Sequence, residues 1–167
     1  MGADLEADRR DALTAATEIT LREATAADVL GIFRVRTAVT ENALTLAELA
    51  DRGLTPASVA DSFARDGKGW VAVERDAIVG FAIAWRDAGK VDALFVLPSY
   101  ERRGIGGRLL DLALAWLSAN GAAQAWLTTG AQTQAAGFYR RRGWEQAGIM
   151  SNGEIRFVCD TARSHLV

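Results

Sequence analysis

The sequence predicts a single α+β domain. Segments with a two-residue alternation and segments with helix caps follow one another along the chain, and no internal repeat or linker separates them. Of the 167 residues, 50% are hydrophobic and 24% are charged, a balance that supports one core and excludes collagen-like and wholly disordered chains. We expect the domain to span residues 18–160, with a flexible tail at 1–17 and a short C-terminal tail at 161–167.

In the first part of the chain, capping sequences predict helices and alternation predicts a strand. The strand is expected at residues 18–23, where polar and apolar side chains alternate. Three helices follow, opened by capping signals at Thr25–Asp28, at Thr45–Glu48 and at Thr55-Pro56. We expect the third of these helices to continue to Gly67.

The middle of the chain changes from helical to strand patterning. Segments 69–75 and 78–85 predict a hairpin, and segment 91–97 predicts another strand, which Pro98 stops. The strongest helix signal runs from Gly104 to Asn120.

The last part of the chain predicts one more helix between short strands. A strand is expected at 123–128 and a helix at 132–142, before two short strands that flank the Asn152-Gly153 turn. The whole chain then holds about seven strands and four or five helices.

Composition excludes several classes of function. The single cysteine, Cys159, excludes an internal disulfide and a cysteine-based zinc site, and the single histidine, His165, argues against a serine–histidine triad or a histidine metal cluster. No apolar run approaches the ~18 residues of a membrane span, and the N-terminus lacks the apolar segment of a signal peptide. A net charge of −2 gives no bulk attraction to nucleic acid. We therefore expect a cytoplasmic protein with no metal and with neither a membrane nor a nucleic-acid partner.

The segment between the 91–97 strand and the long helix predicts an anion site. Glycines without a Cβ let an anion approach backbone N–H groups at a helix N-terminus, and arginines add full positive charges. The P-loop pattern fits poorly because the segment has no lysine, and the dinucleotide pattern fits poorly because Leu109 occupies its third glycine position. A generic nucleotide-binding domain remains an alternative.

Two motifs in this sequence resemble those of the GCN5-related N-acetyltransferase (GNAT) family. Glu101–Gly106 is similar to the family loop Gln/Arg-x-x-Gly-x-Gly/Ala, with Glu101 at the Gln/Arg position. Gln132–Trp144 is similar to the family run Asn-x-x-Ala-x-x-Phe/Leu-Tyr and the Gly-Phe that closes its helix, with Gln132 for asparagine and Trp144 for phenylalanine. The resemblance covers residues 18–160. It implies a three-layer fold on a mixed sheet, antiparallel in its first half, with a splayed parallel pair of strands around a coenzyme.

The resemblance also implies acetyl-CoA as cosubstrate, without a metal. In the family, the loop backbone holds the coenzyme pyrophosphate and the preceding strand pairs its main chain with pantetheine. The implied coenzyme residues are Leu94, Phe95 and Val96 on the strand, Arg102, Arg103, Gly104, Ile105, Gly106, Gly107 and Arg108 in the loop, and Gln132 on the pantetheine arm.

The implied reaction is direct attack of a primary amine on acetyl-CoA in a ternary complex. An amine with a pKa of ~10 must lose a proton at neutral pH, and Asp92, at a position where the family often has a glutamate, is the candidate base through water. A surface strand residue is the alternative for Asp92, and the base would then be Glu41 or solvent. Tyr139 is the candidate acid for the leaving thiolate, with core packing as the alternative.

The acceptor is expected to bind at Glu41, Asn42 and Trp85, where Glu41 would attract a cationic amine. It is a small molecule or a protein that the sequence does not name. A non-catalytic acyl-CoA-binding or sensory module with the same fold is the alternative function. Whether the chain forms a homodimer stays open.

Overall fold

A seven-stranded mixed sheet organises residues 18–162, the part of the chain that this computed structural model describes. The strand order is β1-β2-β3-β4-β5-β7-β6. Only the β4–β5 pair is parallel, and every other neighbouring pair is antiparallel. The bounds are β1 Thr20–Glu23, β2 Gly67–Glu74, β3 Ala77–Trp85, β4 Lys90–Val96, β5 Gln124–Thr129, β6 Glu145–Ile149 and β7 Ile155–Asp160.

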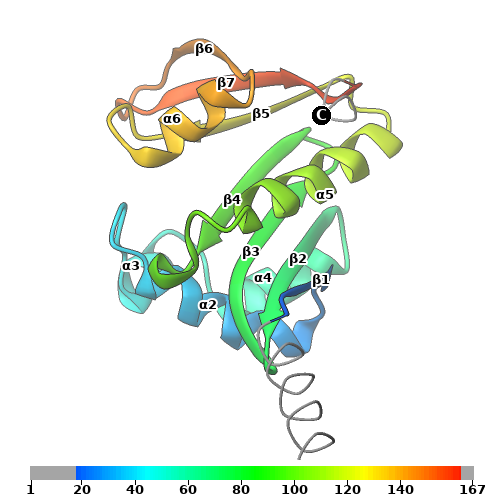
Figure 1. Cartoon of the computed structure of the whole chain (residues 1–167), viewed down its shortest axis with the longest axis vertical. Helices are drawn as coiled ribbons and strands as arrows, with labels where there is room; N and C mark the ends of the chain where they lie inside the picture. Colours follow the sequence, from blue (N-terminus) through cyan, green and yellow to red (C-terminus); the bar gives the residue numbers. More distant parts are fainter. Residues whose placement is uncertain (1–17, 163–167) are drawn as a thin grey trace, which may run out of the picture.

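Helices cover both faces of this sheet (Figure 1). Helices α2 and α4 pack on one face of β2 and β3, and the long helix α5 crosses the other face. Within the described residues, the five α-helices are α2 Val29–Ala38, α3 Leu46–Asp51, α4 Pro56–Phe63, α5 Ile105–Ala119 and α6 Gln134–Arg141. The predicted α+β class and the mixed sheet are confirmed.

Each face of the sheet has its own core because strand side chains alternate between the two faces. On β3, Val79 and Ala82 pack into the cluster under α5, whereas Ile78 and Phe81 pack into the cluster under α2 and α4. Both clusters contain fully buried side chains, such as Leu110 of α5 in one and Val35 of α2 in the other. Of the described helices, none is both long and apolar enough to cross a membrane.

The parallel pair separates soon after it forms. The register joins β4 to β5 only at Lys90 and Trp126, and the Trp126 N–H donates to the Gly89 carbonyl at 3.1 Å. Beyond this point the strands diverge, so β5, β6, β7 and α6 form a separate upper part in Figure 1. The splayed pair implied by the family resemblance is therefore confirmed.

Two predicted helix boundaries are wrong. Helix α4 ends at Phe63 rather than Gly67, because the Ala64 and Arg65 N–H groups bond only three residues back and tighten the last turn. Gly67 instead starts β2, where a Cβ would lie 3.0 Å from the Ser62 carbonyl oxygen. Helix α6 begins at Gln134 rather than at residue 132, since the Thr133 side chain caps it.

The predicted N-terminal tail, residues 1–17, lies outside the described residues, as do residues 163–167 of the predicted C-terminal tail. Thr161 is described and buried, and its hydroxyl donates to the Ala122 carbonyl at 2.6 Å.

Candidate active site

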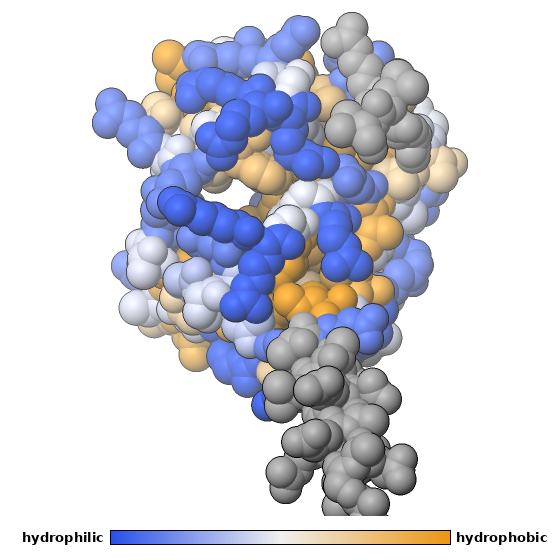
Figure 2. Space-filling view, in the orientation of Figure 1, coloured by the Kyte–Doolittle hydropathy of each residue, from blue (hydrophilic) through white to orange (hydrophobic). Residues whose placement is uncertain are grey.

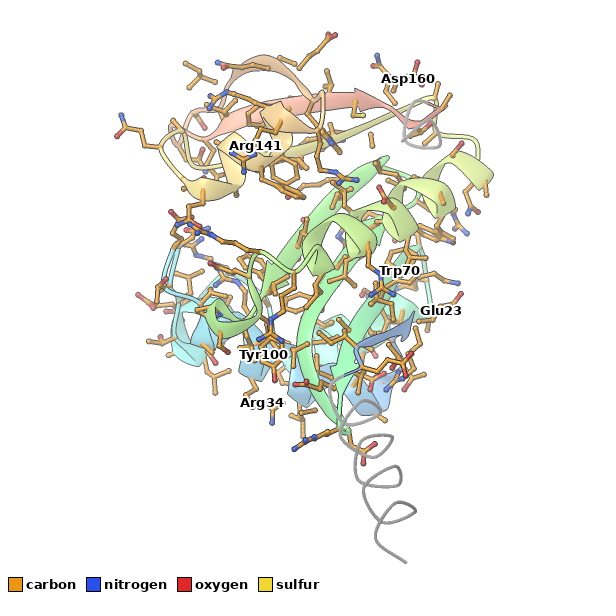
Figure 3. All side chains as sticks on the ribbon, in the orientation of Figure 1. Glu23, Arg34, Trp70, Tyr100, Arg141 and Asp160 are labelled. Atoms are coloured by element: carbon orange, nitrogen blue, oxygen red, sulfur yellow. The ribbon has the colours of Figure 1, made fainter. Side chains whose placement is uncertain are left out.

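A cavity of about 550 Å³ lies where β4 separates from β5. Figure 2 shows the molecule hollowed between its upper part and the part below it. In Figure 3, Arg141 marks α6 above this opening and Tyr100 marks the turn after β4 below it. One wall comes from β4, β5 and α6, and the other comes from α2, α4 and the segments that join α2, α3 and α4.

Strand β4 carries a β-bulge at Asp92. Val91 pairs with Ala84 and Ala93 pairs with Ile83, which leaves Asp92 without a partner on β3. A bulge re-aims the side chain that it carries, and Asp92 lines the cavity. Its carboxylate lies 2.8 Å from the Lys90 ammonium, so the candidate base is held in an ion pair by a neighbour on its own strand.

Beyond the bulge, β4 offers an open backbone edge to the cavity. Leu94, Phe95 and Val96 are half-buried and line the cavity, and their pairing partners lie on β3 alone. Because strand N–H and C=O groups alternate in direction, half of these groups face away from β3. An extended ligand can pair with them as a further strand would.

Tyr139 contributes a hydroxyl that is not bonded within residues 18–162. The ring is 6% exposed and packs against Phe138, Trp144 and Phe157, with centroid distances of 5.2, 5.5 and 6.0 Å. The residue nevertheless lines the cavity, and no described residue hydrogen-bonds to its hydroxyl. Burial raises the pKa of the Tyr139 phenol above its ordinary value, so the group stays protonated at neutral pH.

The loop before α5 presents bare backbone at a helix N-terminus. Gly104 caps the helix with a φ of +76°, in the left-handed region that favours glycine. The first bond of the helix runs from the Arg108 N–H to the Gly104 carbonyl at 3.1 Å, so the N–H groups of Ile105, Gly106 and Gly107 have no partner within the helix. A Cβ on Gly106 would find only Val96 within 4 Å, at 3.8 Å.

The three loop arginines lie around this helix start and are exposed. Arg103 stacks over Tyr100 at 4.9 Å, and Arg102 has a φ of +62°. None of Arg102, Arg103 and Arg108 lines the cavity, whereas Glu101 does. The three arginines therefore surround the helix start at the surface, next to the cavity.

The start of α6 differs from expectation. Gln132 is exposed and does not line the cavity. Thr133 and Ala135 line it instead. Both carboxylate oxygens of Glu41 accept from the Gln134 N–H at 3.1 Å. Glu41 thus places a negative charge at a helix N-terminus and ties the segment after α2 to the upper part of the molecule.

The two other predicted acceptor residues, Asn42 and Trp85, line the same cavity as Asp92 and Tyr139. Asn42 has a φ of +57°, and its carbonyl accepts from Arg36 Nη1 at 3.1 Å. Prediction from sequence missed several cavity-lining polar residues, namely Arg36, Arg52, Arg65, Thr128, Thr129 and Thr133. For Arg36, a signal existed, because it follows buried Ile32 and Phe33 at helical spacing.

The splayed strands with the cavity where they separate, and the glycine-rich start of α5 beside it, match the architecture that the GNAT resemblance implies. A family model described as "Acetyltransferase (GNAT) domain" matches residues 36–158. The chain belongs to this family of acetyltransferases. No curated protein matches it. In the described part of the chain, no three His, Cys, Asp or Glu side chains group to hold a metal ion.

Solved structures share this fold at low sequence identity. PaiA N-acetyltransferase from Thermoplasma acidophilum, in complex with coenzyme A, is 16% identical with a TM-score of 0.73, over 86% of this chain and 99% of that chain. A phosphinothricin acetyltransferase from Sinorhizobium meliloti, in complex with AcCoA, is 22% identical with a TM-score of 0.68, over 85% and 88%. The ribosomal-protein-S18-alanine N-acetyltransferase from Escherichia coli is 17% identical with a TM-score of 0.67, over 86% and 94%.

Proposed function

We propose that this acetyltransferase is an acetyl-CoA-dependent N-acetyltransferase, which transfers the acetyl group to a primary amine by direct attack in a ternary complex. The observation that carries the proposal is the cavity along the open edge of β4, with the start of α5 beside it and Tyr139 in its wall. Family membership and the coenzyme named with two of the similar structures support it.

The chain's own residues fit the coenzyme. The free N–H groups at Ile105, Gly106 and Gly107 offer donors to a pyrophosphate, and the positive end of the α5 dipole adds to them. A Cβ on Gly106 would occupy the space beside these donors. Because glycine has no Cβ, this space stays open to a phosphate. The open edge of β4 at Leu94–Val96 offers main-chain hydrogen bonds to pantetheine. Gln132, which is exposed, would contact the outer part of the pantetheine arm.

The reaction requires charge stabilisation and two proton movements. The amine nitrogen forms a bond to the thioester carbon, and backbone N–H groups on the β4 edge stabilise the negative charge on the carbonyl oxygen. The C–S bond then breaks, the Tyr139 phenol donates its proton to the departing thiolate, and the proton lost by the cationic nitrogen of the adduct restores the phenol. Burial raises the pKa of Tyr139 and makes it a weaker acid, so the phenol donates only as the C–S bond breaks and negative charge develops on the sulfur.

The amine loses its proton to Asp92 through water in this scheme. The bulge turns Asp92 into the cavity, but the ion pair with Lys90 occupies one carboxylate oxygen. Glu41 and solvent remain alternative bases, although both oxygens of Glu41 already accept from the Gln134 N–H. The acceptor is a small molecule or a protein amine.

The ion-paired Asp92, together with Glu101 beside the coenzyme loop, favours one alternative, a non-catalytic acyl-CoA-binding or sensory module. Thiol release from acetyl-CoA with a panel of amines, set beside acetyl-CoA binding by calorimetry, separates the two. Binding together with amine-dependent thiol release supports the enzyme, and binding alone supports the module. The cytoplasmic location and the homodimer remain predictions.

A further inference from the structure

Three arginines line the part of the cavity wall that α2 and the segments after α3 and α4 form. None of them forms an ion pair with a carboxylate of the described residues. Arg36 comes from α2, Arg52 follows α3, and Arg65 follows α4. None of the three lies within 4.0 Å of a carboxylate oxygen of residues 18–162. This region of the cavity wall therefore carries positive charge that Glu48, which interacts electrostatically with Arg52, offsets only in part.

Arg36 is the most constrained member of this arginine group. Its guanidinium stacks 4.4 Å from the centroid of Phe95, and one nitrogen donates to the Asn42 carbonyl. A guanidinium has five N–H donors, so the remaining donors on its edges are available to a ligand. Burial, followed by the charge of Arg52, lowers the pKa of Arg36.

The carboxylates of the cavity are engaged elsewhere or lie apart from these arginines. Glu41 binds the start of α6, and Asp92 is paired with Lys90. Glu101 and Glu154 also line the cavity, and neither forms an ion pair with the arginine group. Glu48 interacts electrostatically with Arg52, but its carboxylate accepts from the Thr45 N–H at 2.7 Å and so serves as a helix cap.

The stacking of Arg36 on Phe95 places its positive charge near the reacting centre. Phe95 packs with the α2 face of the sheet, whereas Leu94 and Val96 pack with the α5 face. Phe95 lies between the two residues whose backbone edge is assigned to the thioester, and successive strand residues are only ~3.3 Å apart. Arg36 therefore lies beside the strand segment to which the thioester is assigned.

We propose that the acceptor is a small primary amine that also carries an oxyanion, such as a carboxylate, which Arg36 and Arg52 bind. This inference rests on the proposed acetyl transfer and names its substrate class. A carboxylate suits a guanidinium because two parallel N–H donors match its two oxygens. A polyamine or another purely cationic acceptor is disfavoured, because its positive charges would be repelled by Arg36 and Arg52.

The chemistry balances for this class of substrate. The ammonium nitrogen gains the acetyl carbon and loses two protons: one goes through the base to solvent before attack, and the other restores the Tyr139 phenol after that phenol has protonated the thiolate released by C–S cleavage. The oxyanion takes no part in the bond changes. The product has lost the ammonium charge and keeps the oxyanion.

The experiment compares amines that differ only in the anionic group. Each ω-amino acid of three to six carbons is paired with the alkylamine that lacks its carboxylate, for example γ-aminobutyrate with butylamine, because both amines have a pKa of ~10. Aminoalkylphosphonates are assayed as well, to compare a phosphonate with a carboxylate as the oxyanion. A diamine is assayed as an acceptor with a second positive charge in place of the oxyanion. We expect the best anionic acceptor to exceed its partner in kcat/KM by about tenfold or more.

Variants assign this preference to the arginine group. Arg52→Gln removes a side chain that makes no hydrogen bond within the described residues, and Arg36→Gln removes the stacked cation. Both should raise the KM for the anionic acceptor towards that of its alkylamine, and should lower kcat/KM for the anionic acceptor several-fold more than for the alkylamine. Arg36→Lys should recover part of the preference. Arg34→Gln is the matched control on α2, since Arg34 lies outside the cavity lining at the lower end of the molecule (Figure 3).

Equal use of each amino acid and its paired alkylamine, or a preference for the diamine, overturns the inference and leaves N-acetyl transfer standing. A preference that survives both Arg36→Gln and Arg52→Gln also overturns it. Acetyl-CoA binding without transfer to any amine of the panel overturns the inference together with the proposed enzymatic function.

Discussion

Substitutions at Gly106 separate coenzyme binding from folding. Gly106 is in the first turn of α5, and a Cβ placed there would meet only the Val96 side chain, at an ordinary contact distance of 3.8 Å. Replacing a helical glycine by alanine stabilises a protein by roughly 0.5–1 kcal/mol when the site is unstrained. We therefore expect Gly106→Ala to raise the melting temperature by up to about 2–4 °C, and Gly106→Val to change it little.

The same added carbons obstruct the approach of a pyrophosphate to the backbone donors of α5. Gly106→Val should weaken acetyl-CoA binding at least tenfold, which corresponds to about 1.4 kcal/mol, and Gly106→Ala should weaken it less. The matched control is Gly137→Ala on α6, where a Cβ would meet only the flexible end of the Arg141 side chain, at 3.2 Å. This control should show normal affinity.

Titration calorimetry with acetyl-CoA, combined with thermal unfolding of each variant, measures both quantities. The reasoning fails if folded Gly106→Val binds acetyl-CoA as tightly as the unsubstituted protein does. It also fails if affinity falls equally in the Gly137→Ala control, because the loss would then come from a general change in the helices.

Three further substitutions test the remaining assignments. Tyr139→Phe should lower kcat by ~10²-fold with acetyl-CoA binding retained; unchanged kcat with a lower melting temperature would make Tyr139 a packing residue. Asp92→Asn should lower kcat/KM at neutral pH and recover partly near pH ~10, where the amine is already free; a uniform loss at every pH would indicate that Asp92 binds the ammonium. For Asp28, two hydrogen bonds from Arg22 and one from the Thr25 N–H lower its pKa to about 2. Because an unfolded aspartate titrates near ~4, this stabilisation of about 1–2 kcal/mol is present above pH ~4 and lost as the pH falls towards 2. Urea unfolding should show that Asp28→Asn removes this pH dependence, and parallel curves for the two proteins would contradict the assignment.

The order of the elements could be predicted from sequence because its signals are local. The Thr45 and Thr55 side chains cap α3 and α4 as predicted, and the alternation of segments 69–75 and 78–85 forms the β2–β3 pair. Gly104 and the apolar pattern after it locate α5 to within one residue of its start. Each of these features depends on neighbours within a few positions.

The cavity wall depends on contacts between distant segments and was predicted only in part. Glu41 reaches Gln134 across 93 positions, and the stacking of Arg36 on Phe95 joins α2 to β4. A helical pattern can place Arg36 on the inner face of α2 but cannot show that it lacks a carboxylate partner. The bulge at Asp92 depends on register with β3, which alternation along one strand does not reveal.

The central claim is that the acetyl group moves from acetyl-CoA to an amine bound in the cavity beside β4. The most direct test is mass spectrometry with isotope-labelled acetyl-CoA, with released thiol measured in the same reaction. The account predicts one labelled N-acetyl product for each thiol released, and ~10²-fold slower formation of both in Tyr139→Phe while acetyl-CoA still binds. Tight binding of acetyl-CoA with no labelled amine, or thiol release without a labelled amine, would contradict it.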